Sequence, residues 1–194
     1  NTGTNSSPVF NLQSKNMFQS EMLDFGKSSS PILVDLNNDG LKDLMFGYLG
    51  EFDINSLNHY TCAISVYMNT GTAEIPKFEW LTDDYQNLSS LINNIDLFPA
   101  MGDLDNDGDL DAIVGDYSGY LHYLENTSSN SSVVNLIMNQ PQMQDDQGIP
   151  IDIGYCAKPV LFDLDQDNDL DLVIGEATGV LNYYENIGGA NSPL

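Results

Sequence analysis

The stretch DLDNDGDLDAIVG, from Asp103 to Gly115, places an aspartate at every second position up to Asp111. Its flanked form, PAMGDLDNDGDLDAIVG (Pro99–Gly115), aligns without a gap to two other stretches. These are PILVDLNNDGLKDLMFG (Pro31–Gly47) and PVLFDLDQDNDLDLVIG (Pro159–Gly175). Three such copies in one chain indicate a repeated structural unit rather than an isolated acidic turn.

The repeat extends on both sides of the acidic stretch. GDYSGYLHYLENTSS, from Gly115, matches GEATGVLNYYENIGG, from Gly175, while the first copy carries an insert at roughly Glu51–Thr61. Upstream, NTGTNSSPVF at the start of the chain matches NTGTAEIPKF, from Asn69. The whole unit is therefore repeated, and the acidic stretch is one part of it.

Each unit is predicted to contain short strands separated by glycine, asparagine and aspartate. An apolar run enters the loop, a second leaves it, a third alternates apolar and polar residues, and a fourth follows an Asn-Thr-Gly turn. The expected strands are 32–34, 99–101 and 160–162; 44–46, 112–114 and 172–174; 121–123 and 181–183; and 9–12, 78–81 and 133–138. The segment 85–95 is expected to hold one helical turn.

Four short strands per unit of about 60 residues are typical of a β-propeller blade. We therefore predict an all-β fold of blades with four antiparallel strands each. A β-sandwich with three acidic hairpins is the alternative, but it gives no reason for whole units to repeat. The expected organisation is a fourth strand and linker at 1–30, one blade at 31–98, a second at 99–158, and three strands of a third at 159–194.

The strong negative charge of the chain limits the kinds of partner that it can bind. The 194 residues include 29 acidic and 5 basic side chains, a formal net charge of -24, and there is no arginine. Binding to nucleic acid needs clustered lysine and arginine, and an anionic membrane surface would repel this chain. No apolar run reaches the ~18–20 residues of a spanning helix, so membrane insertion is not expected. A cation is the expected partner.

Numbered from its first aspartate, each loop has oxygen-bearing side chains at positions 1, 3, 5 and 9. Glycine or asparagine stands at position 6 (Gly40, Gly108, Asn168), and both tolerate the left-handed backbone that a chain curling around an ion requires. The varied residue at position 7 is expected to offer its carbonyl. The candidate ligands are Asp35, Asn37, Asp39, Leu41 and Asp43; Asp103, Asp105, Asp107, Asp109 and Asp111; and Asp163, Asp165, Asp167, Asp169 and Asp171.

This donor set predicts Ca²⁺, about three ions per chain. Calcium takes six to eight oxygen ligands, whereas magnesium demands a tighter octahedron and zinc prefers the cysteine and histidine that these loops lack. An EF-hand needs glutamate at position 12 and flanking helices. Position 12 is instead Phe46, Val114 or Ile174. The other alternative to a calcium site is an acidic turn that is solvated and holds no ion. The same spacing of oxygen-bearing residues in all three copies disfavours it.

The sequences DLNNDGLKDLMFG, DLDNDGDLDAIVG and DLDQDNDLDLVIG resemble the calcium loops of FG-GAP/VCBS repeats. Those repeats build the β-propellers of integrin α-subunits and of many secreted microbial proteins. The resemblance covers essentially the whole chain. It implies calcium binding between the first two strands of each blade, by the side chains at positions 1, 3, 5 and 9 and the carbonyl at position 7. Asn37 and Asn168 depart from the usual aspartate and glycine.

Such propellers usually have six to eight blades, whereas this chain holds three. A fourth-strand segment at 8–15 stands at one end, and the last unit lacks its own fourth strand. We therefore expect completion by another copy of the chain or by a longer parent, because an open sheet edge invites strand addition.

Three functions remain open from the sequence. The first is an extracellular adhesion or binding module for a protein or glycan, with Tyr48, Trp80, Tyr85, Tyr117 and Tyr120 and the insert at 51–61 as candidate contacts. Millimolar extracellular calcium suits such sites, so a secreted or cell-surface location is expected. The second is a structural subunit that assembles into an oligomer or filament. The third is a propeller lyase or hydrolase.

The inventory for catalysis is poor, so no enzyme is expected. His59 lies in the insert. His122 is predicted on a polar strand face, aligned with Ser65 and Asn182, and Glu125 and Glu185 align with Met68. Cys62 and Cys156 are read as two thiols or one bridge. Asn-X-Ser/Thr sequences at Asn5, Asn87, Asn126 and Asn130 are a weak signal for glycosylation.

Overall fold

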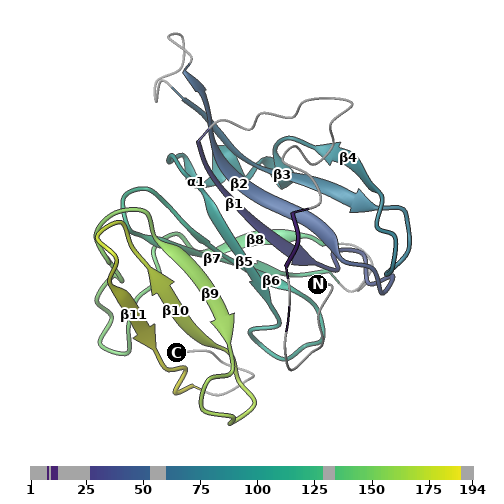
Figure 1. The fold of residues 1–194 in the computed structure, drawn as a ribbon. Coiled ribbons are helices and arrows are strands. Elements are labelled where there is room, and N and C mark those ends of the chain that lie inside the picture. The colour runs from purple at the N-terminus through teal and green to yellow at the C-terminus, as the bar shows by residue number, and fades with distance from the viewer. Residues whose placement is uncertain (1–7, 9, 13–26, 53–59, 129–133, 189–194) are drawn as a thin grey trace.

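The computed structural model of the chain describes residues 8, 10–12, 27–52, 60–128 and 134–188. These residues form three antiparallel sheets, each built from consecutive strands (Figure 1). The prediction of an all-β fold is confirmed. The sheets are open, and within each sheet every strand pairs with its neighbours in the sequence.

The first two sheets have four strands and the third has three. The first contains β1 (Lys27–Val34), β2 (Asp43–Phe52), β3 (Tyr60–Asn69) and β4 (Phe78–Thr82). The second contains β5 (Phe98–Gly102), β6 (Asp111–Gly115), β7 (Leu121–Asn126) and β8 (Leu136–Gln140). The third contains β9 (Lys158–Phe162), β10 (Asp171–Gly175) and β11 (Leu181–Tyr184).

Short helical turns, η1 (Tyr85–Asn87) and α1 (Leu88–Ile92), lie between the first and second sheets in the sequence, within the segment expected to hold one. One strand prediction is wrong: described residues 10–12 are not in a strand. Most of the insert, 53–59, lies outside the described residues, as do residues 9 and 13–15 of the fourth-strand segment expected at 8–15.

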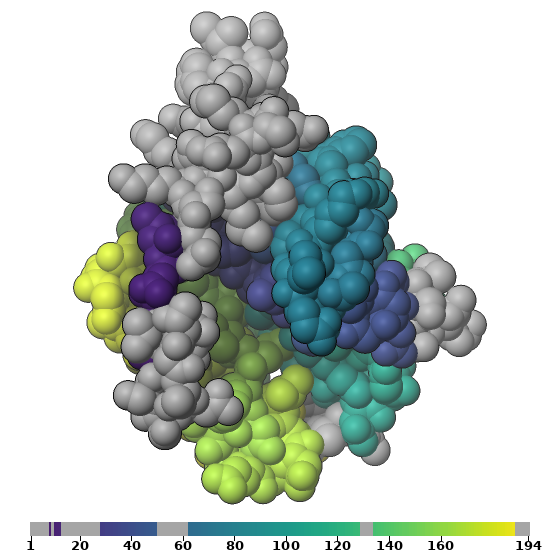
Figure 2. All heavy atoms as spheres, turned by 45° about the vertical axis from the view of Figure 1, so that its right-hand side comes forward, coloured from purple at the N-terminus to yellow at the C-terminus, as the bar shows by residue number. Residues whose placement is uncertain are grey.

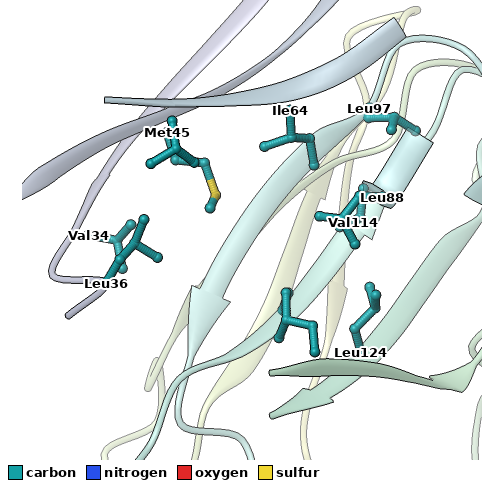
Figure 3. Packing of buried hydrophobic residues seen from close by; sticks show 11 residues of the cluster. Val34, Leu36, Met45, Ile64, Leu88, Leu97, Val114 and Leu124 are labelled. Carbon is teal, nitrogen blue, oxygen red and sulfur yellow. The ribbon is translucent and has the colours of Figure 1, made fainter. Parts of the chain in front are cut away.

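The sheets pack face to face through two apolar clusters. The first joins residues of the first sheet, such as Met45 and Ile64, to Val114 and Leu124 of the second (Figure 3). The second joins Ile113 and Leu121 of the second sheet to residues of the third, including Leu172 and Ile174. Strand alternation explains this, because neighbours such as Ile113 and Val114 point to opposite faces of one sheet. The second sheet is thus buried on both faces.

Strand β5 lies next to both β1 and β9, and each of the three leads directly into an acidic loop. The three loops therefore connect equivalent strand pairs: β1 to β2, β5 to β6, and β9 to β10.

Candidate calcium loops

The loop backbones are held by their own side chains. In the second loop both carboxylate oxygens of Asp103 accept backbone amides, from Asp107 and Gly108, each at 3.1 Å. Asp107 in turn accepts the amide of Asp109 at 3.0 Å. The first loop repeats these bonds with Asp35 and Asp39, and the third repeats most of them with Asp163 and Asp167. The alternating acidic side chains therefore curl inward around a common centre.

A left-handed backbone occurs at two positions in each loop. At position 6, φ is 86° for Gly40, 96° for Gly108 and 76° for Asn168, as expected from these residue types. Position 4 is also left-handed, at Asn38, Asn106 and Gln166. Sequence reasoning did not single out position 4, although asparagine in two of the three copies was a signal for it.

The curl brings three carboxylates together in two loops. Oxygens of Asp103, Asp105 and Asp107 all lie within 4.8 Å of one another, and so do those of Asp163, Asp165 and Asp167. Oxygens bound to one Ca²⁺ at ~2.3–2.6 Å fall within that mutual separation. The first loop has Asn37 in the middle place, where its amide donates to Asp39 at 2.9 Å.

Position 9 is not one of those three carboxylates, and it has a structural role. Asp111 is buried, and its carboxylate accepts the amides of Leu104 at 3.0 Å and Asn126 at 2.8 Å. Asp43 and Asp171 make the equivalent pairs of bonds. The position-9 aspartate therefore joins the start of the loop to the end of the third strand. An oxygen that accepts one amide keeps a lone pair for a cation.

Two of the three loops also have an aspartate side chain at position 7. The Oδ1 atoms of Asp109 and Asp169 are buried and have no hydrogen-bond partner in the described part of the chain. A buried carboxylate oxygen without a donor is costly. These two atoms therefore fit a site that a cation completes.

The loop carboxyls also repel one another. Burial, followed by the charges of Asp107, Asp105 and Asp103, raises the pKa of Asp109 to about 6. The pKa of Asp111 is also raised to about 6, mainly by burial. Burial and the neighbouring Asp167 likewise raise the pKa of Asp169 to about 6. A divalent cation would reverse this preference, because it favours the ionised carboxylates.

The remaining candidate residues are dispersed. Trp80 is 59% exposed and Tyr117 40% exposed, whereas Tyr48, Tyr85 and Tyr120 are half-buried. Tyr155, which sequence reasoning missed, is 60% exposed and lies 5.6 Å from Tyr117 between ring centroids. His59 lies outside the described residues.

Two smaller expectations are also resolved. Cys62 and Cys156 are two thiols and not one disulfide bridge. Asn126 is buried and its side-chain oxygen accepts two backbone amides, which disfavours glycosylation there. Asn87 is exposed, while Asn5 and Asn130 lie outside the described residues.

The expectation of a polar face at His122 is wrong. His122 is only 6% exposed, and its Nε2 lies 3.0 Å from Oδ2 of Asp116, which is fully buried. Asn94 donates to the same oxygen, and the amide of Tyr120 donates to the other. The row containing His122 faces the first sheet, so the ring is buried and Asp116 supplies a polar partner. This cluster joins the α1–β5 connection to the β6–β7 turn.

Comparisons of the chain with models of known protein families, with characterised proteins and with solved structures found no match. Within the described residues, the helices are too short to span a bilayer.

Proposed function

We propose that the chain is a calcium-binding module of the β-propeller type, which works outside the cell in adhesion or in binding a protein or glycan. The observation that carries this proposal is the convergence of three carboxylates within 4.8 Å in each of two loops that share one spacing. The resemblance to FG-GAP/VCBS loops and the succession of antiparallel sheets support it.

In this proposal each loop holds one Ca²⁺ through positions 1, 3, 5, 7 and 9. The ion offsets the repulsion among the aspartates and fixes the turn between the first two strands of each sheet. Extracellular calcium sites of this kind have Kd values of ~10⁻⁴–10⁻³ M. They fill at the millimolar calcium found outside cells, which favours a secreted or cell-surface location.

Calorimetric titration and thermal unfolding test the calcium sites. We expect about three ions per chain. Occupancy at 100 times Kd adds ~2.7 kcal/mol per site to the free energy of unfolding. Asp107→Asn and Asp167→Asn should each weaken one site. Glu74→Gln changes the charge equally at an exposed position outside the loops and is the matched control. A melting temperature that chelation leaves unchanged would refute the calcium role.

The exposed pair of Tyr117 and Tyr155 is the candidate contact for a glycan or protein. Exposed aromatic rings offer large, rigid contact area with a polar tip. A glycan array probed with the calcium-loaded chain should give signals that Tyr117→Ala and Tyr155→Ala reduce. Ile75→Ala, at an exposed apolar side chain outside this pair, should not reduce them.

A further inference from the structure

The third sheet has an open edge where the other two sheets have a fourth strand. β4 pairs with β3, and β8 pairs with β7. In the described part of the chain, β11 pairs only with β10. Its other edge presents backbone N–H and C=O groups, and such an edge accepts a further strand.

A cavity of about 1070 Å³ lies where that strand would pack. Leu172 and Tyr184 line it from the third sheet, and Ile113 and Tyr123 from the second. Between the first and second sheets, the equivalent space is occupied by Leu136 and Met138 of β8. The third sheet has no counterpart of these two side chains among its strands.

The chain contains a second copy of the missing strand. NTGTNSSPVF, at 1–10, matches NTGTAEIPKF at 69–78, and β4 begins at the last residue of that copy. On this alignment Phe10 corresponds to Phe78 and Leu12 to Trp80. Phe10 is 82% exposed and Leu12 73% exposed. In Figure 2 the described N-terminal residues (purple) lie at the surface.

We propose that residues 10–12 of one copy of the chain lie in the fourth strand of the third sheet in a second copy, and that two copies exchange these strands reciprocally. This inference rests on the propeller architecture proposed above. In the first sheet Asn69 pairs with Phe78, and Tyr67 with Trp80. The equivalent pairs in the third sheet are Asn186 with Phe10 and Tyr184 with Leu12. This register places both apolar side chains in the cavity.

Two copies are favoured by the number of sheets. The described residues of one copy supply three sheets, so those of two copies supply six. Closed propellers have four to eight blades, and a two-fold axis can close such a pair of copies. The described sheets of three copies would number nine, which lies outside that range.

The exposed faces of the first and third sheets complement this arrangement. Leu104, in the loop after β5, and Leu121 of β7 are buried against the third sheet, at 5% and 0% exposure. Their counterparts Leu164 and Leu181 are 50% and 74% exposed. On the first sheet, Leu33 and Trp80 are exposed, and Phe46 and Tyr67 on the same face are already buried. Contact between the first sheet of one copy and the third of the other would cover both exposed surfaces.

The second strand of each sheet has a glycine at the equivalent position, and in the first two sheets this glycine lies where the next sheet packs closely. A Cβ atom on Gly47 would lie 1.5 Å from the carbonyl oxygen of Leu97, and one on Gly115 would lie 2.0 Å from that of Ala157. The third such glycine, Gly175, has only Leu181 nearby, at 3.6 Å. Leu97 and Ala157 each stand two residues before the proline of the next sheet. The equivalent residue for Gly175 is Ser29, which precedes Pro31, in the other copy.

Disulfide trapping tests the exchange directly. The register pairs Asn11 of one copy with Glu185 of the other. Directly opposed strand residues bring their Cα atoms within the ~4.4–6.8 Å that a disulfide needs. An equimolar mixture of Asn11→Cys and Glu185→Cys chains should form a disulfide-linked species of twice the chain mass under mild oxidation. Neither variant alone should form this disulfide-linked species. Because each variant keeps the two native thiols, each alone also controls for disulfides that those thiols form.

Native mass spectrometry in millimolar calcium provides the second measurement. We expect a dimer that Phe10→Asp and Leu12→Asp each weaken at least tenfold. Ile75→Asp, at a side chain that is 76% exposed, should leave the dimer unchanged. Gly175→Ala should also weaken the dimer while leaving the melting temperature of the monomer unchanged.

Two results would overturn the exchange. One is a calcium-loaded monomer at micromolar concentration. The other is a disulfide that forms only within single chains of the Asn11→Cys, Glu185→Cys double variant, which would mean that the segment folds back on its own third sheet. A dimer without bound calcium would support the exchange and remove the calcium role, so the two proposals fail separately.

Discussion

The carboxylate of Asp111 accepts the backbone amide of Asn126 at 2.8 Å, although the two residues are 15 positions apart. The other carboxylate oxygen accepts the amide of Leu104. Position 9 of the loop is therefore a junction of loop and sheet as well as a candidate calcium ligand.

Replacement of this aspartate should destabilise the fold without calcium. In Asp111→Asn an amide group takes the place of one accepting oxygen and faces a backbone N–H. A buried hydrogen bond to a charged group contributes ~1.5–3 kcal/mol, so we expect a loss of about that size. Urea unfolding in chelator measures it. Asp107→Asn, at an exposed side chain of the same loop, should cost stability only when calcium is present. Equal losses for both variants in chelator would contradict the structural role.

The close approach of the second and third sheets at Gly115 leads to a second prediction. In Gly115→Ala the added Cβ would overlap the backbone of Ala157, and relief of such overpacking typically costs ~1–3 kcal/mol. Gly175→Ala makes the same change where the nearest atom is at an ordinary contact distance, and it is the matched control. Calorimetry of dilute, monomeric protein should show a lower melting temperature for Gly115→Ala and an unchanged one for Gly175→Ala. Similar melting temperatures for the two variants would mean that the sheets do not pack as described.

Sequence patterns were sufficient for most strands and for the curl of the loops. Repetition located the β1–β2, β5–β6 and β9–β10 turns, and alternation located β7 and β11, because each pattern reflects local geometry. The glycine and asparagine residues at position 6 predicted the left-handed backbone that the structure has there. The start of β1 at Lys27 was missed, since KSSS carries no apolar alternation and is a strand only through pairing with β2.

Long-range pairing explains the other misses. Asp111 looks like any other aspartate of its loop, and its bond to Asn126 exists only once β7 has returned beside β6. His122 looks polar in the sequence and is buried because the first sheet covers its face. The bridge between Gln144 and Pro150 lies in a connection with no repeated copy, so no comparison within the chain could locate it.

The buried pair of His122 and Asp116 leads to a third prediction. His122→Phe removes the ring nitrogen that faces Asp116 and leaves a fully buried carboxylate with fewer donors. We expect a loss of ~1–3 kcal/mol in the free energy of unfolding, the usual cost of an unsatisfied buried polar group. Asn182→Phe, at the equivalent place in β11, is the control, since that position is only half-buried. A His122→Phe chain as stable as the parent would show that the pair contributes nothing to the fold.

Stability of the calcium-free chain should fall as pH rises through the range from about 4 to 6. The pKa values of Asp109, Asp111 and Asp169 are raised to about 6 in the folded chain, chiefly by burial. In the unfolded chain these carboxyls return to about 3.8, so between the two values the folded state binds more protons. The free energy of unfolding is then greater below this window and is lost as the carboxyls ionise. Calorimetry in chelator should give a higher melting temperature at pH 5 than at pH 7.5.

Saturating calcium should invert this dependence, because the cation binds the ionised carboxylates and its site is lost when they are protonated. The general repulsion of a chain with a net charge of -24 also weakens the fold at higher pH, so a control must separate the two effects. The double variant Asp109→Asn, Asp169→Asn removes two of the titrating carboxyls and only two of the negative charges. In chelator, this double variant should show a much smaller change of melting temperature with pH. A profile that keeps its full slope would assign the pH dependence to overall charge, and a chelated chain more stable at pH 7.5 would contradict the raised pKa values themselves.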